Sequence, residues 1–138
     1  MKWITWEQVG VDRMACAWLI KRSIDPQAEF EFIPVGQVPP PDGEAFDIPG
    51  AHLSHHQGHC TFHTLLTVYK LSDPVLKRIA RIVDEADVIQ DVSVEPAAVG
   101  LDLICRGIRL SSPDDGVALE RGALIYEALY AALATQNI

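Results

Sequence analysis

The chain has 138 residues, a length typical of one domain, and 49% of them are apolar while 22% are charged. Its net charge of −8 argues against a protein that binds nucleic acid or an anionic membrane by bulk electrostatics, although a local basic pocket is still compatible with it. The three cysteines are far apart and form no CxxC pair, which favours reduced thiols in the cytoplasm. The first residues do not resemble a signal peptide, and no apolar run approaches the roughly 20 residues of a membrane helix. We therefore expect one cytoplasmic domain over residues 1–138.

The N-terminal part of the sequence predicts a small sheet beside one buried helix. Residues 2–7 are typical of a short strand, and residues 28–35 alternate Phe with Glu as a half-buried strand does. Between them, the apolar segment MACAWLI predicts a buried helix that begins at Arg13, with Asp12 as its N-cap. Three consecutive prolines indicate a surface loop within residues 36–45, and the next ten residues read as extended.

The rest of the sequence is typical of helices. Apolar residues at helical spacing predict helices over residues 61–71, 73–88, 95–110 and 112–134. Asp73 and Pro74 are an N-cap followed by a first-turn proline, and Ser112, Pro113 and Asp115 resemble a second such start. About five helices with a sheet of two to four strands predict an α+β fold dominated by helices.

All five histidines lie within the stretch AHLSHHQGHCTFH: His52, His55, His56, His59 and His63. Neutral imidazole is the commonest side-chain metal ligand. In an extended segment, alternation places His55 on the same face as Leu53, and His63 lies at the edge of the apolar face of the helix that follows. We expect these two to converge on the interior, whereas His52 and His56 face solvent. A solvated polar turn that is rich in imidazole is the alternative.

The segment IVDEADVIQD supplies two carboxylates to such a site. Asp84 and Asp87 are three residues apart on one predicted helix and flank its apolar stripe, where unpaired carboxylates are costly. Two histidines with two aspartates suit zinc, iron(II) or manganese(II). The predicted divalent-metal ligands are His55, His63, Asp84 and Asp87. The alternative is an ordinary charged helix face, because Arg81 and Glu85 form an i,i+4 pair on the same helix.

The helix start GVDRMAC is a second candidate site. A helix N-terminus with Arg13 beside it offers donors that match an oxyanion, so Asp12 and Arg13 are expected to border an oxyanion pocket. In the alternative, Asp12 only caps the helix and Arg13 pairs with an acid. Cys16 and Cys60 fit buried small residues better than a nucleophile or a soft metal ligand. The sequence contains no GxGxxG, P-loop, HExxH or GxSxG motif.

Several segments taken together resemble the chromate-resistance protein family, in the C-terminal domain of the ChrB type. The resemblance runs in order through VDRMACAWLIKRSIDPQAEFEFIPV, FDIPGAHLSH, CTFHTLL, DPVLKRIARIVDEADV and PAAVGLDLICRGIRLSSPDDGVALERGALIYEALYA. DR-x-A-C-x-WLI and FD-[IV]-PGA are its most specific motifs. Proteins of this type accompany a chromate efflux transporter, and longer members are regarded as chromate-responsive regulators with a separate N-terminal domain. Because the resemblance starts at about Trp3, we expect a stand-alone domain without that regulatory domain.

The resemblance also bears on the candidate residues. It implies that His, Asp and Glu replace one another at the positions of His63 and Asp84, an exchange that a metal ligand tolerates. It implies a histidine after the paired acids Asp114 and Asp115, where this chain has Gly116. That departure weakens a role for this end of the chain in the site.

Residues and resemblance together favour an accessory or sensor domain linked to chromate or oxyanion resistance, with bound zinc, iron or manganese. The alternative is a metal-dependent hydrolase or oxidoreductase of unknown substrate, since a metal with an open coordination position activates water. Direct reduction of chromate by thiols is not favoured, because the cysteines show no sign of a redox pair. A homodimer is compatible with the sequence.

Overall fold

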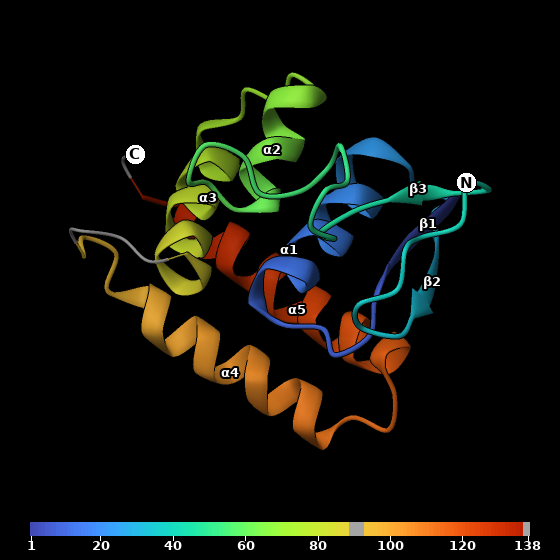
Figure 1. Cartoon of the computed structure of the whole chain (residues 1–138). Helices are drawn as coiled ribbons and strands as arrows, with labels where there is room; N and C mark the ends of the chain where they lie inside the picture. The colour runs from blue at the N-terminus through green and yellow to red at the C-terminus, as the bar shows by residue number, and fades with distance from the viewer. Residues whose placement is uncertain (89–92, 137–138) are drawn as a thin grey trace.

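A small parallel sheet forms one side of the molecule and helices form the rest (Figure 1). The computed structural model describes residues 1–88 and 93–136. The sheet consists of β1 (Lys2–Trp6), β2 (Glu29–Ile33) and β3 (Glu44–Ala45), in the order β2-β1-β3. All its pairings are parallel, and Trp3 of the central strand lies opposite Phe30 on one side and Glu44 on the other. The strands expected at both places are confirmed: β2 is half-buried as predicted, whereas the central residues of β1 are buried on both faces.

Helix α1 (Val11–Leu19) connects β1 to β2 and lies at the centre of the molecule. It continues directly into a π-helical segment, Ile20–Ile24, before the chain returns to the sheet. Nearly every residue of α1 is buried, as its uniformly apolar sequence predicts. The expected N-cap is wrong: the helix begins at Val11, and Gly10 occupies the cap position without a side-chain hydrogen bond.

After β2 the chain crosses to the other side of β1, forms β3 and continues as an irregular segment. Within that segment the backbones of His56 and His59 pair as a tight antiparallel bridge, with N–O distances of 3.2 and 2.9 Å. Gln57 and Gly58 form the turn between them, with φ angles of 54° and 79°. Two consecutive left-handed residues are typical of a type I′ hairpin turn. This turn places His59 directly before the following helix.

The described part of the chain contains four further α-helices: α2 (Thr61–Val68), α3 (Pro74–Asp87), α4 (Ala97–Ser111) and α5 (Asp115–Ala134). Asp73 caps α3 as predicted, accepting a hydrogen bond of 2.8 Å from the Val75 N–H. The cap of α5 is Asp114, not the Ser112–Asp115 pattern, and it accepts from the Val117 N–H at 2.9 Å. The mixed α+β fold dominated by helices is confirmed.

The core is built around α1, which contacts each of the other four helices. Trp18 stacks against Phe62 of α2 and Tyr126 of α5, and the Tyr126 hydroxyl donates a hydrogen bond of 2.6 Å to the Val11 carbonyl. Burying an aromatic side chain of this size contributes about 1.5–3 kcal/mol. None of the described helices has the length and apolar character needed to cross a membrane.

Candidate metal centre at the carboxyl edge of the sheet

The candidate centre lies where the parallel strands end. Asp12 and Arg13 follow β1, and Asp47 follows β3 on the other side of the topological switch between these two neighbouring strands. Open sheets with parallel strands commonly bind ligands at such a switch point, beyond the carboxyl ends of the strands. His55 and Asp87 approach this point from the irregular segment and from the end of α3.

Asp12 is the most deeply buried residue of the centre, with 2% of its surface exposed. Although it lies in the first turn of α1, its carboxylate accepts hydrogen bonds from the backbone N–H groups of Thr61 at 2.8 Å and Phe62 at 3.0 Å. These groups form the N-terminus of α2, where free N–H groups and the helix dipole favour an anion. The Cys16 thiol, at 3.5 Å, and the His55 ring complete its surroundings.

His55 brings the carboxylates together. Its Nε2 lies 3.1 Å from Asp12 Oδ2, 3.1 Å from Asp87 Oδ2 and 3.7 Å from Asp47 Oδ1. The hydrogen bond with Asp12 raises the pKa of His55 to about 9, and the surrounding negative charges add to this rise while burial opposes it. Ligand atoms of Asp12, His55 and Asp87 all lie within 4.8 Å of one another.

Two further carboxyl groups of the centre have raised pKa values. Burial and the charge of Asp12 raise the pKa of Asp47 to about 8, although the Arg13 guanidinium opposes the rise. The same two causes raise the pKa of Asp87 to about 6. Asp47 also has a left-handed backbone with φ of 55°, a conformation uncommon outside glycine that concentrates at functional sites. Asp12, Asp47 and Asp87 lie close together here, and a bound cation would relieve the repulsion among their charged forms.

Most hydrogen-bond donors of the Arg13 guanidinium bind other groups within the protein. Its Nη2 donates to the Asp47 carbonyl at 2.7 Å, and its Nη1 lies 3.3 Å from the Trp6 carbonyl and 3.4 Å from that of Glu7. Its Nε lies 3.1 Å from Asp47 Oδ2, although the N–H does not point along this direction. Arg13 therefore ties the ends of β1 and β3 together and retains few donors for an external oxyanion.

A cleft of about 450 Å³ lies in front of His55 and Asp87. Its other walls come from the ends of β1 and β3 and from the bend that follows β3. Its lining residues are Trp6, Arg13, Asp47, Ile48, Pro49, Gly50, Ser54, His55 and Asp87. The side chain of His55 is 47% exposed, so it faces this cleft and not the core.

The other two expected ligands lie in a separate cluster. Asp84 accepts a hydrogen bond of 2.7 Å from the Cys60 N–H, and its second oxygen lies 2.9 Å from His59 Nδ1. The His63 ring stacks on the His59 ring with centroids 3.9 Å apart, and burial lowers the pKa of His63. These groups line a second cavity of about 350 Å³ that also includes Lys77 and other residues of α2 and α3.

The expected four-ligand set is therefore divided. Asp84 and Asp87 are neighbours on α3 as predicted, but Asp84 caps the start of α2 while Asp87 reaches His55. Among the described residues, the group with metal-ligand spacing contains Asp12 in place of His63 and Asp84. Metal binding itself stays a prediction. His52 and His56 are exposed as expected, but the predicted alternation fails, because Ser54 of the same expected face is buried and His55 is exposed.

Asp47 is the residue of the centre that the sequence argument did not assign. It lies in the FDIPGA segment, two residues before Pro49 of a proline–glycine bend, and its Oδ1 accepts a hydrogen bond of 2.6 Å from the Thr61 hydroxyl. An aspartate between a strand and a sharp bend is the signal that points to such a position. Asp115 lies outside the centre and accepts hydrogen bonds from the Gln8 and Val9 N–H groups that precede α1.

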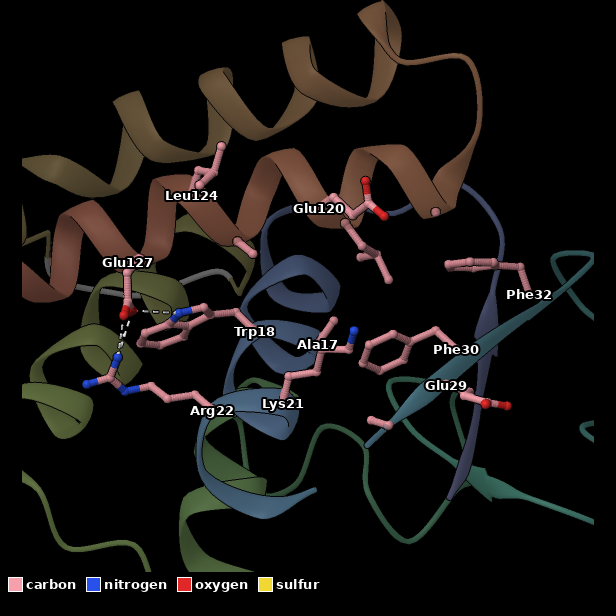
Figure 2. Close-up of a pocket in the computed structure, with 14 residues that line it drawn as sticks. Ala17, Trp18, Lys21, Arg22, Glu29, Phe30, Phe32, Glu120, Leu124 and Glu127 are labelled. Atoms are coloured by element: carbon pink, nitrogen blue, oxygen red, sulfur yellow. Dashed lines mark hydrogen bonds and ion pairs between the residues drawn. The ribbon is translucent and has the colours of Figure 1, made fainter. Parts of the chain in front are cut away.

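A larger cavity of about 770 Å³ lies away from this centre, between α1, β2 and α5 (Figure 2). Trp18, Phe30 and Phe32 contribute apolar walls. At one end Arg22 pairs with Glu127, whose carboxylate lies 2.7 Å from the guanidinium. Among the residues that the structure describes, this cavity brings together no group of ligand atoms comparable to that around His55.

Two comparisons with known proteins match almost the whole chain. Residues 3–133 match the family model described as the C-terminal domain of ChrB. The chain is 33% identical over 130 residues to "Protein ChrB" of Cupriavidus metallidurans, and the match covers 94% of this chain and 40% of that protein. The chain thus spans less than half the length of this relative. No solved structure matches the chain. By the extent of both matches, the chain belongs to the ChrB C-terminal domain family.

Proposed function

We propose that this domain binds a divalent metal through Asp12, His55 and Asp87, and that the metal presents an open position to a small oxyanion in the adjoining cleft. In this role the domain is an accessory or sensor element of chromate-linked oxyanion resistance. The observation that carries the proposal is the placement of His55 Nε2 at 3.1 Å from an oxygen of each of the two aspartates, with all three ligand atoms inside 4.8 Å.

The ligand spacing suits a first-row divalent ion. Asp12, His55 and Asp87 would hold such an ion through one imidazole nitrogen and two carboxylate oxygens, all within 4.8 Å of one another. This donor set is compatible with zinc, iron(II) or manganese(II). Hydrogen bonds from the α2 backbone hold the Asp12 carboxylate in place, which supports the ligand as outer-shell contacts do in metal sites.

A bound cation also changes what the cleft can attract. The carboxylates around His55 repel a dianion such as chromate, while protonated His55 and Arg13 attract it, so the bare centre has no strong net attraction for an oxyanion. A divalent ion is the largest local charge in such a site and would supply that attraction. The oxyanion is therefore expected to meet the metal and not the Arg13 side chain, whose donors are mostly used within the protein.

The number of protein ligands favours a second candidate function. Catalytic metal sites commonly have three protein ligands and one open position, whereas structural sites are closed by four. The three-ligand group here borders a cleft of about 450 Å³. A metal-dependent hydrolase or oxidoreductase fits this arrangement as well, because such a metal supplies an activated water when bound. Turnover of a phosphoester or amide by the metal-loaded protein would favour this function over oxyanion sensing.

Elemental analysis by mass spectrometry of protein purified without a polyhistidine tag tests the metal site. We expect one equivalent of manganese, iron or zinc in the wild-type chain, and loss of the metal in His55→Ala and Asp87→Asn. His52→Ala is the matched control, because His52 belongs to the same histidine stretch and is exposed. Retention of metal in both site variants would contradict the proposal. Loss of metal in His63→Ala and retention in His55→Ala would place the metal in the second cluster instead.

A further inference from the structure

Helix α4 presents an apolar face that no described part of the chain covers. The helix lies at the outside of the molecule, and its inner side, with Ala98, Leu101 and Cys105, packs against neighbouring helices (Figure 1). Its outer side exposes four large apolar residues: Val99 at 78%, Leu103 at 65%, Ile104 at 50% and Leu110 at 75%. Single exposed apolar residues are ordinary on protein surfaces, but a contiguous group along one helix marks an interaction surface.

Two glycines lie on the same outer side. Gly100 and Gly107 are seven residues apart, which is two turns of a helix. A glycine in a helix interior costs about 1 kcal/mol relative to alanine. A Cβ built at either position would meet nothing within 4 Å, so packing inside the chain gives no reason for the missing side chain. Absence of a side chain does allow another backbone or a large side chain to approach closely.

The large and small residues on the outer face of α4 are arranged so that the face can pack against a second copy of itself. Along α4 the outer face reads Gly100, Leu103, Gly107, Leu110, and these positions mirror one another about Cys105. When two copies of α4 run antiparallel about that centre, each leucine faces a glycine of the other copy. The leucines act as knobs and the glycines as the holes that receive them.

We infer that α4 pairs with α4 of a second copy of this chain in an antiparallel, two-fold symmetric dimer. Leu103 of each copy packs on Gly107 of the other, and Leu110 packs on Gly100. An interface with two-fold symmetry requires a surface that is complementary to itself, and this pattern provides one. Binding to an unrelated partner would not require such a pattern. The inference is independent of the metal site, since the outer face of α4 contributes none of its ligands.

The charged edge of the face is compatible with pairing. Arg106 borders the apolar residues, and its guanidinium is paired with Asp102 one turn earlier on the same helix. The edge therefore brings no uncompensated charge into the interface. A contact centred on one helix pair lies at the low end of stable interface sizes, so we expect a dissociation constant in the micromolar range. Because each chain carries a net charge of −8, added salt should strengthen the dimer.

Sedimentation equilibrium of the full 138-residue chain, from about 1 to 200 μM to bracket a micromolar Kd, tests the inference. We expect a reversible monomer–dimer equilibrium in the wild type. Gly107→Leu fills one hole, so it should weaken association at least tenfold, which corresponds to about 1.4 kcal/mol. The variant should still fold, because the new side chain points into open space, and a thermal melt verifies this.

A compensating variant tests the register. In Leu103→Ala/Gly107→Leu the knob and the hole exchange positions, so the two-fold arrangement again places a large residue opposite a small one. We expect this double variant to associate more tightly than Gly107→Leu alone. A wild-type chain that remains monomeric throughout would overturn the inference. A dimer that Gly107→Leu does not weaken would overturn it as well.

Discussion

Asp12 and Thr61 are 49 positions apart, yet the carboxylate of one accepts the backbone N–H of the other at 2.8 Å. The same carboxylate also accepts the N–H of Phe62, so Asp12 of α1 serves as the anionic cap of α2. This relationship fixes the position of one proposed metal ligand with two charge-assisted hydrogen bonds. It also explains why a charged side chain is tolerated with only 2% of its surface exposed.

Removing this cap should destabilise the fold even without metal. In Asp12→Ala two buried N–H groups of α2 lose their acceptor, and each such group costs about 1–3 kcal/mol. We therefore expect the free energy of unfolding to fall by about 2–4 kcal/mol, allowing for partial relaxation, as measured by urea denaturation in the presence of a chelator. Asp102→Ala is the control, because it removes only the exposed ion pair with Arg106 and should cost less than about 1 kcal/mol. Equal losses in the two variants would contradict the capping role.

Two histidines of the stretch should have pKa values that are shifted in opposite directions. In metal-free protein, NMR of the imidazole protons should give a pKa of about 9 for His55, because of its hydrogen bond with Asp12, and a lowered pKa for His63. A raised folded-state pKa means that His55 contributes stability fully below its usual pKa near 6.5 and loses it as the pH rises through about 9. A normal pKa for His55 would show that the carboxylates do not surround it in solution.

The contact between α1 and α5 depends on the absence of a side chain at Gly122. A Cβ there would lie 2.9 Å from Met14 Sδ and 3.1 Å from its Cγ. We expect Gly122→Ala to lower the free energy of unfolding by about 1–3 kcal/mol through overpacking. Gly100→Ala, at a position with open space, should instead raise it by about 0.4–1 kcal/mol when dilute protein is used. A stabilising Gly122→Ala would mean that Met14 moves aside freely.

Local sequence signals predicted most of the fold. The alternation of Phe30 and Phe32 with glutamates predicted β2, and Asp73 with Pro74 predicted the start of α3. These features depend on neighbours in the sequence, so they can be read without tertiary contacts. The cap of α1 was predicted wrongly for the opposite reason, because the carboxylate of Asp12 is used by a helix far along the chain.

The candidate centre was predictable only in part. The structure brings His55 and Asp87 together, but the reason differs from the prediction: His55 was expected on an inward apolar face and instead faces the cleft with its side chain 47% exposed. Helical spacing also made Asp84 a neighbour of Asp87, but spacing does not show that Asp84 caps α2. Predicting that Asp47 belongs to the centre required knowledge that β1 and β3 are parallel neighbours. Only then do the residues that follow both strands meet at one edge of the sheet.

Calorimetric titration of chromate into the metal-loaded and the metal-free chain tests the central claim most directly. We predict that chromate binds the metal-loaded wild type and His52→Ala, and that binding is lost after chelation and in His55→Ala. Sulfate and phosphate in parallel titrations show whether the cleft selects among tetrahedral oxyanions. Equal binding of chromate with and without metal, or no binding to a fully metal-loaded chain, would contradict an oxyanion site built on Asp12, His55 and Asp87.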